Sequence, residues 1–407
     1  MKQLNKDQPS QLQLGLKNNW QQFSLLVLIN SFVGGMVGLE RTIIPSLAEV
    51  EFGLAAKTAI LSFIIVFGIT KASANYLMGK LADKWGRKKL LILGWLFGLP
   101  VPFLLMYAPT WNWIIIANIF LGLNQGFAWS STVIMKIDLV GEKDRGLAMG
   151  INEFAGYLSV GILAFLTGWI ATNYGLRPYP FFIGIGLAIL GFLGSIFLIK
   201  DTHKHVKKES SDNQTPLLKH IFKDTTFRNP NLGSVSQAGL VNNLNDGMVW
   251  GLLPMFLLTK DFNLEQIGVV AAVYPAIWGI GQLFTGKMAD HYSKKRLLFW
   301  GMLLQAVALV ALIFSPFYWT DIVIAALLGW GTAMVYPTFL AAIADNTHPS
   351  QRAESIGIFR LWRDLGYAIG ALLTGIIADS FGLGGAMGTI AGLTFLSAVI
   401  IHLRMEV

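Results

Sequence analysis

The stretch GKLADKWGRKK at residues 79–89 returns as GKMADHYSKKR at residues 286–296, 207 residues later. The same offset relates other positions, aligning residues 150–175 with 357–382, Asp138 with Asp345, and Arg145 with Arg352. Three separated blocks share an offset that is about half of the 407-residue chain. The chain is therefore predicted to contain two copies of one structural unit.

The composition indicates that the solvent of this chain is lipid. Hydrophobic residues make up 54% of the chain and charged residues 13%, whereas a soluble protein carries about 25% charged residues. There are no cysteines, which excludes disulfides and thiolate metal sites. Residues 1–20 form a polar tail before an apolar stretch that is too long for a cleavable signal peptide, so this stretch is expected to stay in the membrane.

Twelve apolar runs are each long enough to cross about 30 Å of hydrocarbon as a helix. They lie at residues 21–47, 56–81, 89–108, 111–138, 146–171, 179–199, 233–259, 265–288, 296–316, 320–344, 353–378 and 384–404. Their order predicts an all-α integral membrane protein with 12 transmembrane helices in two pseudo-symmetric six-helix bundles, residues 21–199 and 233–407. Residues 200–232 are polar and are predicted to be a linker without a sustained apolar period, with at most a short surface helix near 216–224.

Basic residues gather on one side of this arrangement when the N-terminus is placed in the cytoplasm. Of the 31 Lys and Arg residues, three fall outside: Lys57, Arg177 and Lys260. Five more lie within spans or at their ends: Arg41, Lys71, Lys136, Arg360 and Arg363. This bias orients both termini and the linker toward the cytoplasm of a cell (inner) membrane. The net charge of +8 is thus a topology signal, and no nucleic-acid partner is expected.

The 79–89 stretch has the form Gly-x-Leu-x-Asp-x-x-Gly-Arg-Lys-x. It closely resembles the signature between helices 2 and 3 of the major facilitator superfamily, which has a weaker echo between helices 8 and 9. The resemblance covers essentially the whole chain. It implies two six-helix bundles around a central cavity that opens alternately to either side of the membrane (the major facilitator fold).

The resemblance also implies a gate on the cytoplasmic side. Gly79 removes a side chain, so that a neighbouring helix can pack closely. In the family the aspartate at this point of the signature, here Asp83, caps the positive N-terminus of helix 11. Arg87 would then pair with Asp138 at the end of helix 4. Such contacts form in one conformational state and break when the cytoplasmic side opens.

The second half repeats this set with Asp290, Lys294 and Asp345. Ser293 stands where the signature has glycine, so the second gate is expected to be looser. The predicted gate residues are Gly79, Asp83, Gly86, Arg87, Asp138, Arg145, Gly286, Asp290, Lys294, Asp345 and Arg352.

Charged side chains inside the spans must face one another or water, because each costs about 2.5–3.5 kcal/mol at mid-bilayer. Their helical spacing places them on stripes that converge on an aqueous cavity. The candidates for substrate binding are Asn30, Arg41, Gln125, Trp129, Asn242, Tyr274, Trp278, Arg360, Arg363 and Tyr367. The candidates for proton coupling are Glu40, Glu153, Asp246 and Asp364. For any one of them, a structural ion pair or a polar contact between helices is the alternative.

These patterns predict a secondary active transporter of a small organic solute, working by rocker-switch alternating access with proton coupling. The cationic span at 353–378 favours an anionic or zwitterionic solute, because guanidinium groups suit carboxylate or phosphate. A multidrug/proton antiporter exporting lipophilic compounds is the alternative. Two departures weigh against it: Asn118 stands where many proton-coupled relatives have Arg, and residues 150–161 lack the antiporter Gly-Pro pair. A membrane sensor that keeps the fold without transporting is a more distant alternative.

An enzyme is not expected. The sequence has no phosphate-binding Gly-Lys-Ser/Thr loop and no His-Glu-x-x-His or Gly-x-Ser-x-Gly motif. His203 and His205 lack a visible third ligand, so neither a metal nor another cofactor is expected. The expected partners are a small-molecule substrate, protons and the lipid bilayer, and the protein is expected to be a monomer.

Overall fold

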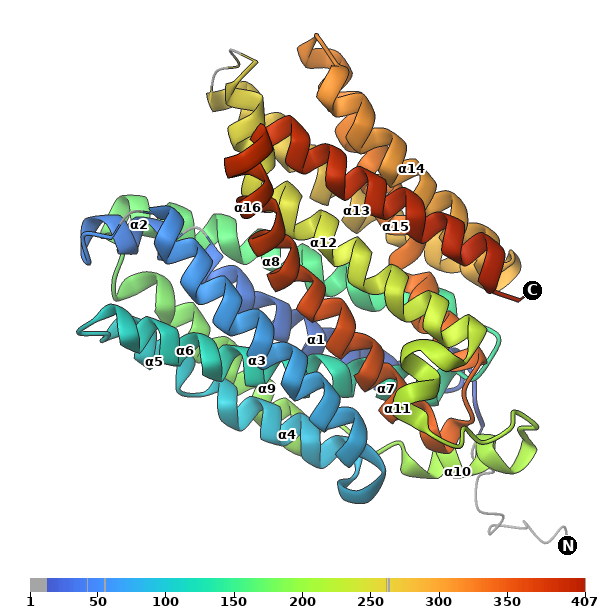
Figure 1. Ribbon diagram of the computed structural model, residues 1–407. Helices are drawn as coiled ribbons and strands as arrows, with labels where there is room; N and C mark the ends of the chain where they lie inside the picture. Colours follow the sequence, from blue (N-terminus) through green and yellow to red (C-terminus); the bar gives the residue numbers. More distant parts are fainter. Residues whose placement is uncertain (1–12, 42, 55, 261, 263, 407) are drawn as a thin grey trace, which may run out of the picture.

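The structure is a computed structural model that describes residues 13–41, 43–54, 56–260, 262 and 264–406. Within these residues the regular structure is helical, with no strand (Figure 1). All twelve predicted apolar spans fall on helices. In the first half these are α1 (Trp20–Arg41), α2 (Ile43–Val50), α3 (Ala56–Trp85), α4 (Arg87–Gly98), α5 (Val101–Met106), α6 (Trp111–Asn124), the π-helix η1 (Gln125–Trp129), α7 (Ser130–Val140), α8 (Arg145–Tyr174) and α9 (Tyr179–Phe197). In the second half they are α12 (Pro230–Leu258), α13 (Leu264–His291), α14 (Lys294–Phe314), α15 (Tyr318–Asp345) and α16 (Pro349–Arg404).

Eight helical stretches of the described chain are long and apolar enough to cross a membrane. The spans on α3, on α6 to α7 and on α12 are not among these eight, and all three carry buried polar side chains such as Asn75, Lys136 and Asp246. One of the eight, α16, holds two predicted spans, because Gly382 turns the chain between them with a φ of 75°. Glycine adopts this left-handed conformation without a Cβ clash. The twelve-span topology and its orientation stay predictions.

The two most extensive contacts between the halves are those of α3 with α16 and of α8 with α13. Both pairs approach at a glycine of the repeated stretch. A Cβ on Gly79 would lie 2.6 Å from the carbonyl oxygen of Ala353, and a Cβ on Gly286 would lie 2.5 Å from that of Gly146. Since Gly146 and Ala353 are themselves related by the 207-residue offset, the two close contacts are equivalent in the repeat.

The segment 200–232 is more ordered than its composition predicts. It contains α10 (His203–Asp212), α11 (Ile221–Lys223) and the π-helix η2 (Asp224–Arg228). Thr202, Val206 and Glu209 are buried and follow the i, i+4, i+7 spacing of one helical face, with the basic residues of α10 around them. We call the end of the molecule where α10 lies the linker end. In Figure 1, α10 lies at the lower right and the C-terminal end of α16 lies at the right.

Candidate functional site

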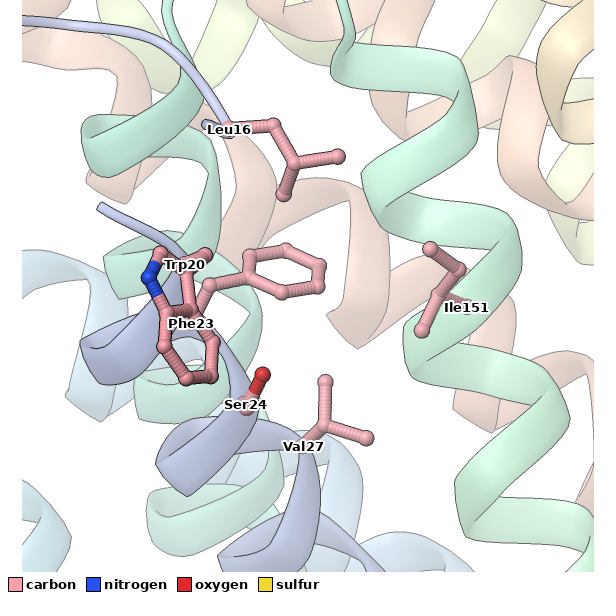
Figure 2. Close-up of a pocket in the computed structure, with 6 residues that line it drawn as sticks. All are labelled: Leu16, Trp20, Phe23, Ser24, Val27 and Ile151. Atoms are coloured by element: carbon pink, nitrogen blue, oxygen red, sulfur yellow. The ribbon is translucent and has the colours of Figure 1, made fainter. Parts of the chain in front are cut away.

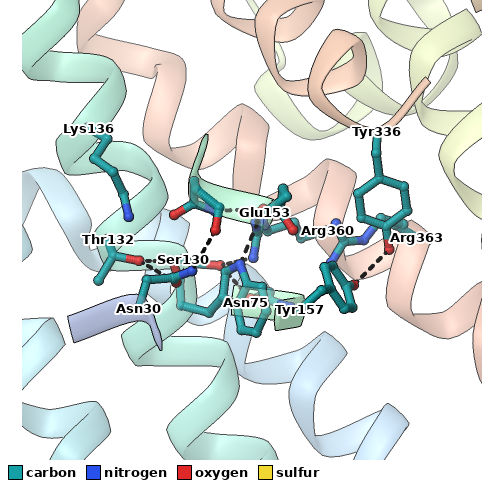
Figure 3. A network of polar contacts seen from close by, with 12 residues as sticks. Asn30, Asn75, Ser130, Thr132, Lys136, Glu153, Tyr157, Tyr336, Arg360 and Arg363 are labelled. Atoms are coloured by element: carbon teal, nitrogen blue, oxygen red, sulfur yellow. Dashed lines mark hydrogen bonds and ion pairs between the residues drawn. The ribbon is translucent and has the colours of Figure 1, made fainter. Parts of the chain in front are cut away.

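A network of buried polar side chains joins the two halves around Glu153 of α8 (Figure 3). The Oε1 atom of Glu153 accepts hydrogen bonds from Trp129 Nε1 at 3.2 Å and Asn152 Nδ2 at 2.8 Å. The same oxygen lies 3.5 Å from Nη2 of Arg360, which comes from α16 in the other half. Arg360 also donates to the hydroxyl of Ser130 at 3.2 Å. Glu153 and Arg360 therefore form an ion pair across the junction of the halves.

The network continues from Ser130 to a second carboxylate, that of Asp364. The Ser130 hydroxyl donates to Asn75 at 2.5 Å, and the Asn75 amide donates to Asp364 at 2.5 Å. Arg363 Nη2 lies 2.9 Å from the carboxylate of Asp364, and Lys71 Nζ lies 4.0 Å from it. A buried ion pair is tolerated only when its atoms are hydrogen-bonded in this way.

Four aromatic rings pack beside this network, and we call them the aromatic cluster: Trp129, Tyr157, Trp278 and Tyr336. The ring centroids of Tyr157 and Trp278 are 4.3 Å apart, those of Trp278 and Tyr336 are 4.9 Å apart, and those of Trp129 and Tyr157 are 5.5 Å apart. The guanidinium of Arg363 lies 5.2 Å from the Tyr336 ring centroid. The cluster thus contains rings from both halves and touches the charged network through Trp129 and Tyr336.

Asp246 of α12 lies at the second-half side of the cluster. The Tyr274 hydroxyl donates a hydrogen bond to its carboxylate and lies 3.3 Å from the Thr332 hydroxyl. The Tyr274 ring centroid is 6.0 Å from that of Trp278. Asp246 is 4% exposed, and Tyr274 links it to the aromatic cluster.

A π-helical segment, η1, positions Trp129. A π-turn shifts the side-chain phase of a helix and is frequent at functional sites. Here α3 approaches closely, since a Cβ on Gly126 would lie 2.3 Å from that of Ala74. The regular helical stripe expected across the 111–138 span is therefore interrupted. Gln125, the first residue of η1, donates to the Val33 carbonyl at 2.7 Å.

Other predicted residues bond within the first half. Asn30 accepts from Thr132 at 2.9 Å and donates to the carbonyl of Asn152 at 3.0 Å. Glu40 accepts from Asn118 at 3.3 Å. The side chain of Arg41 lies outside the described part of the chain.

Two predicted residues of the second half lie apart from these bonds. Asn242 is fully buried, and among the described residues neither of its amide atoms has a hydrogen-bond partner. Tyr367 is half-buried where α16 packs on α12, and its carbonyl oxygen would lie 2.8 Å from a Cβ on Gly247.

The first copy of the repeated stretch forms a compact charge cluster at the linker end. Arg87 Nη2 lies 2.7 Å from Asp83, and Arg87 Nε lies 3.3 Å from Asp138, which also accepts from Thr202 at 2.8 Å. Gly86 directly precedes α4 and has a φ of 87°, a conformation that favours glycine. Arg87 is fully buried.

The expected cap of the 353–378 helix by Asp83 is replaced by another contact. Asp83 pairs with Arg87, which lies one turn further along the chain. The N-terminus of α16 is capped instead by the His348 side chain, which accepts from the Ser350 N–H at 3.3 Å.

The second copy performs the capping that was expected of the first. Asp290 accepts from the N–H groups of Gly146 at 2.6 Å and Leu147 at 2.9 Å, in the first turn of α8. Free N–H groups at a helix N-terminus attract a carboxylate. Lys294 lies 2.7 Å from Asp345. The carboxylate of one half thus caps a helix of the other.

Glu209 of α10 connects the two repeat-related arginines, and the sequence reasoning missed it. Arg352 lies 2.7 Å from Glu209, and Arg145 pairs with the same carboxylate. Arg145 also lies 2.7 Å from Asp345. Burial alone would raise the pKa of Glu209, but hydrogen bonds and charge from Arg352 and Arg145 outweigh it and lower the pKa below its ordinary value. The linker therefore ties both halves together at this end.

Sequence signals existed for some of the missed residues. Tyr157 lies one helical turn after Glu153, on the same face. Glu209 is the only acid within the basic run 203–209, and it completes the stripe of Thr202 and Val206. Asn75 and Ser130 carried no signal beyond being polar within a predicted span.

A surface groove lies apart from these residues, between α1 and α8 (Figure 2). Its volume is about 320 Å³, and it is lined by Leu16, Trp20, Phe23, Ser24, Val27 and Ile151. No charged side chain lines it, and none of the candidate residues takes part. The candidate site is the buried network and the aromatic cluster.

Two helical halves with a buried ion-pair network at their junction and a repeated charged stretch in each half are typical of a membrane transporter. The family model described as Major Facilitator Superfamily matches residues 23–234 and 235–406, so this chain belongs to the major facilitator superfamily. The family prediction is confirmed, as is the prediction of a transporter rather than an enzyme. Members of the family are multi-pass membrane proteins, in agreement with the apolar helices.

Among the similar proteins are the multidrug resistance proteins MdtG of Salmonella arizonae and Salmonella choleraesuis. Each is 23% identical over 393 residues, which cover 94% of this chain and 95% of the relative. The crystal structure of the human organic anion transporter MFSD10 (TETRAN) aligns with a TM-score of 0.77 at 14% identity. That alignment covers 97% of this chain and 100% of the other, and it shows a shared fold.

Proposed function

We propose that this protein is a proton-coupled secondary active transporter of a small organic solute, with an anionic or zwitterionic solute favoured. Its twelve helices cross a cell (inner) membrane, and the linker end with both termini faces the cytoplasm. The two halves rock against each other, so that the central residues are reached from one side at a time.

The observation that carries the proposal is the buried pair of Glu153 and Arg360 at the junction of the halves. Removing two charges from water costs free energy of folding, so a buried pair at this position is expected to have a function in transport. When the halves part, water and a solute reach this pair. An anionic group can then replace Glu153 as the partner of Arg360.

The distribution of ion pairs supports opening away from the linker end. At the linker end, Arg145 reaches Asp345 of the other half. The pairs of Arg177 with Glu51 and of Lys260 with Asp321 each stay within one half. Opening at the linker end therefore requires ion pairs to break, and a difference of about 1.4 kcal/mol already changes a conformational equilibrium tenfold.

Proton coupling follows from the same residues. A proton on Glu153 neutralises the carboxylate and frees Arg360 for a solute anion. Asp246 is held by the Tyr274 hydroxyl and sits beside the same cluster, so it is the second exchange site. Carboxylates in such positions take up or release a proton when access changes from one side to the other.

A second candidate function is a multidrug/proton antiporter. It is supported by the similarity to proteins named multidrug resistance protein MdtG. Its solutes would be lipophilic, and a permanently charged lipophilic cation would be transported in place of an anion.

The test is solute-driven proton flux in liposomes that contain the purified protein and an internal pH dye. Benzenesulfonate is a suitable anion, because it stays charged and does not carry protons through lipid by itself; benzyltrimethylammonium is the matching cation. We expect benzenesulfonate to elicit proton movement, and Glu153→Gln and Asp246→Asn to reduce it at least tenfold.

The control is Asp321→Asn, which alters a buried carboxylate paired with Lys260 away from the network. It should retain flux within about twofold. Full flux in both Glu153→Gln and Asp246→Asn would refute the coupling assignment, and flux with the cation alone would favour the antiporter.

A further inference from the structure

The charged groups around the junction do not balance. Seven charged residues interact electrostatically there. Four are basic, Lys71, Lys136, Arg360 and Arg363, and three are acidic, Glu153, Asp246 and Asp364. Three of the basic residues lie within 4.0 Å of a carboxylate. The fourth, Lys136, has no carboxylate of the described residues within that distance. One positive charge is therefore left over.

Lys136 is fully buried on α7, and its ammonium points toward Thr132 and Asn30 (Figure 3). Its hydrogen bond within the described chain goes to the carbonyl of Leu26 at 3.1 Å. An ammonium has three donors, so two remain. No carboxylate of the described residues lies within 4.0 Å of it. A buried ammonium that no carboxylate contacts directly costs free energy of folding, which points to a ligand that supplies a negative charge in contact with it.

Among the buried donors that lack an acceptor in the described residues, two belong to the charged network and the aromatic cluster. They are Nε of Arg360 and Nε1 of Trp278. Arg360 is an electrostatic neighbour of Lys136, and Trp278 belongs to the aromatic cluster. Trp129 joins these parts, because it donates to Glu153, the partner of Arg360, and packs on Tyr157. The hydrogen-bond donors of Lys136 and Arg360 that lack an acceptor therefore lie beside the aromatic cluster.

We propose that the solute is an aromatic organic anion with a single oxyanion group. Lys136 and Arg360 bind the oxyanion, and the aromatic cluster binds the ring. While Glu153 is ionised, one negative charge balances the extra cation. The ring enters between Tyr157 and Trp278, which come from different halves and separate when the halves part. Offset or edge-to-face contacts between aromatic rings add to binding beyond the area that they bury. This inference rests on the proposed function and names its solute class.

The first test measures binding to the detergent-purified full chain by calorimetry with three probes. Benzenesulfonate has a ring and a negative charge, methanesulfonate has the charge alone, and benzyltrimethylammonium has a ring with a positive charge. We expect benzenesulfonate to bind at least tenfold more tightly than either of the others. Equal binding of methanesulfonate would overturn the role of the ring, and tighter binding of the cation would overturn the proposal.

The second test isolates the charge of Lys136. Lys136→Gln keeps a donor for the Leu26 carbonyl and removes the charge, whereas Lys136→Arg keeps both. We expect Lys136→Gln to weaken benzenesulfonate binding at least tenfold without lowering the thermal unfolding midpoint, and Lys136→Arg to bind within about threefold of the unaltered protein. Lys80→Gln, which removes an exposed lysine of α3, serves as the control and should bind normally.

A merely structural Lys136 would give the opposite result. Lys136→Gln would then bind benzenesulfonate normally, with or without a lowered unfolding midpoint, and the proposal would be overturned. The calorimetric result does not depend on proton flux. Selective binding of benzenesulfonate without proton flux would refute proton-coupled transport and leave the solute class intact. Proton flux with selective binding of the cation would refute the solute class and leave proton-coupled transport intact.

Discussion

The two copies of the repeated stretch, residues 79–89 and 286–296, use matching residues for different contacts. Asp83 pairs with Arg87 inside its own half, whereas Asp290 caps α8 of the other half. The reason lies in the helix that each aspartate faces. The N-terminus of α16 already has a side-chain cap from His348, and the N-cap residue of α8, Asp144, makes no such bond. A repeat therefore preserves positions, while the local cap decides which contact forms.

The backbone contacts of the two copies are much more alike than the partners of their charged side chains. Gly79 and Gly286 meet Ala353 and Gly146 at nearly the same distance. The junction of the halves is thus symmetric where main chains touch and asymmetric where side chains pair. Four predictions test this contrast between the copies.

The largest difference is expected between Arg87→Ala and Lys294→Ala. Arg87 is fully buried between Asp83 and Asp138, so its loss leaves a buried carboxylate unpaired and costs about 3–5 kcal/mol. The side chain of Lys294 is 23% exposed in its pair with Asp345, so its loss costs about 0–1 kcal/mol. Unfolding in detergent measures both, and equal losses would show that the two charge clusters are equivalent.

Glu209→Gln is expected to make the two halves separate more often at the linker end. Its carboxylate pairs with Arg145 and Arg352, and charged hydrogen bonds of this kind contribute about 1.5–3 kcal/mol. Because the chain has no cysteine, Ser355→Cys, at a buried position of α16, can report opening by its rate of thiol labelling. Labelling should be at least tenfold faster when Glu209→Gln is added.

The pH dependence gives this prediction a control. The pKa of Glu209 is lowered, so its pairing is complete above the ordinary glutamate pKa of about 4.3 and is lost as the pH falls through the lowered value. Labelling of Ser355→Cys should rise only at such acid pH, whereas Glu209→Gln should label quickly at neutral pH. A neutral-pH rate that is unchanged by Glu209→Gln would argue that Glu209 does not hold the halves together at the linker end.

Gly286→Val tests the symmetric part of the junction. Its side chain would meet the Gly146 carbonyl oxygen, since the Cβ alone lies at 2.5 Å, and overpacking of this kind costs about 1–3 kcal/mol. The thiol at position 355 should therefore label faster. Gly279→Val is the matched control in the same helix, because nothing lies within 4 Å of its Cβ. Equal labelling of both variants would show that the close approach is unimportant.

The sequence predicted the helices well and the pairing of side chains less well. Apolar run length and the repeat were enough to place helices, and the spacing of Arg360 and Asp364 placed both at the junction. Periodicity gives the face of a helix but not the element opposite it. The spacing therefore did not predict that Glu40 accepts a hydrogen bond from Asn118 within its own half. The composition of 200–232 hid α10, although the spacing of Thr202 and Glu209 marked its buried face.

The smallest effect separates Asp290→Asn from Asp83→Asn. The Asp290 carboxylate faces two N–H groups of α8, and the charge of such a cap contributes about 0.3–1 kcal/mol. An asparagine keeps an acceptor oxygen, so only this part is lost, and labelling of Ser355→Cys should rise about two- to fivefold. The Asp83 side chain is 37% exposed and bonds within its own half, so Asp83→Asn should leave labelling unchanged. A larger effect at Asp83 would mean that the first copy also holds the halves together, and the asymmetry between the copies would be wrong.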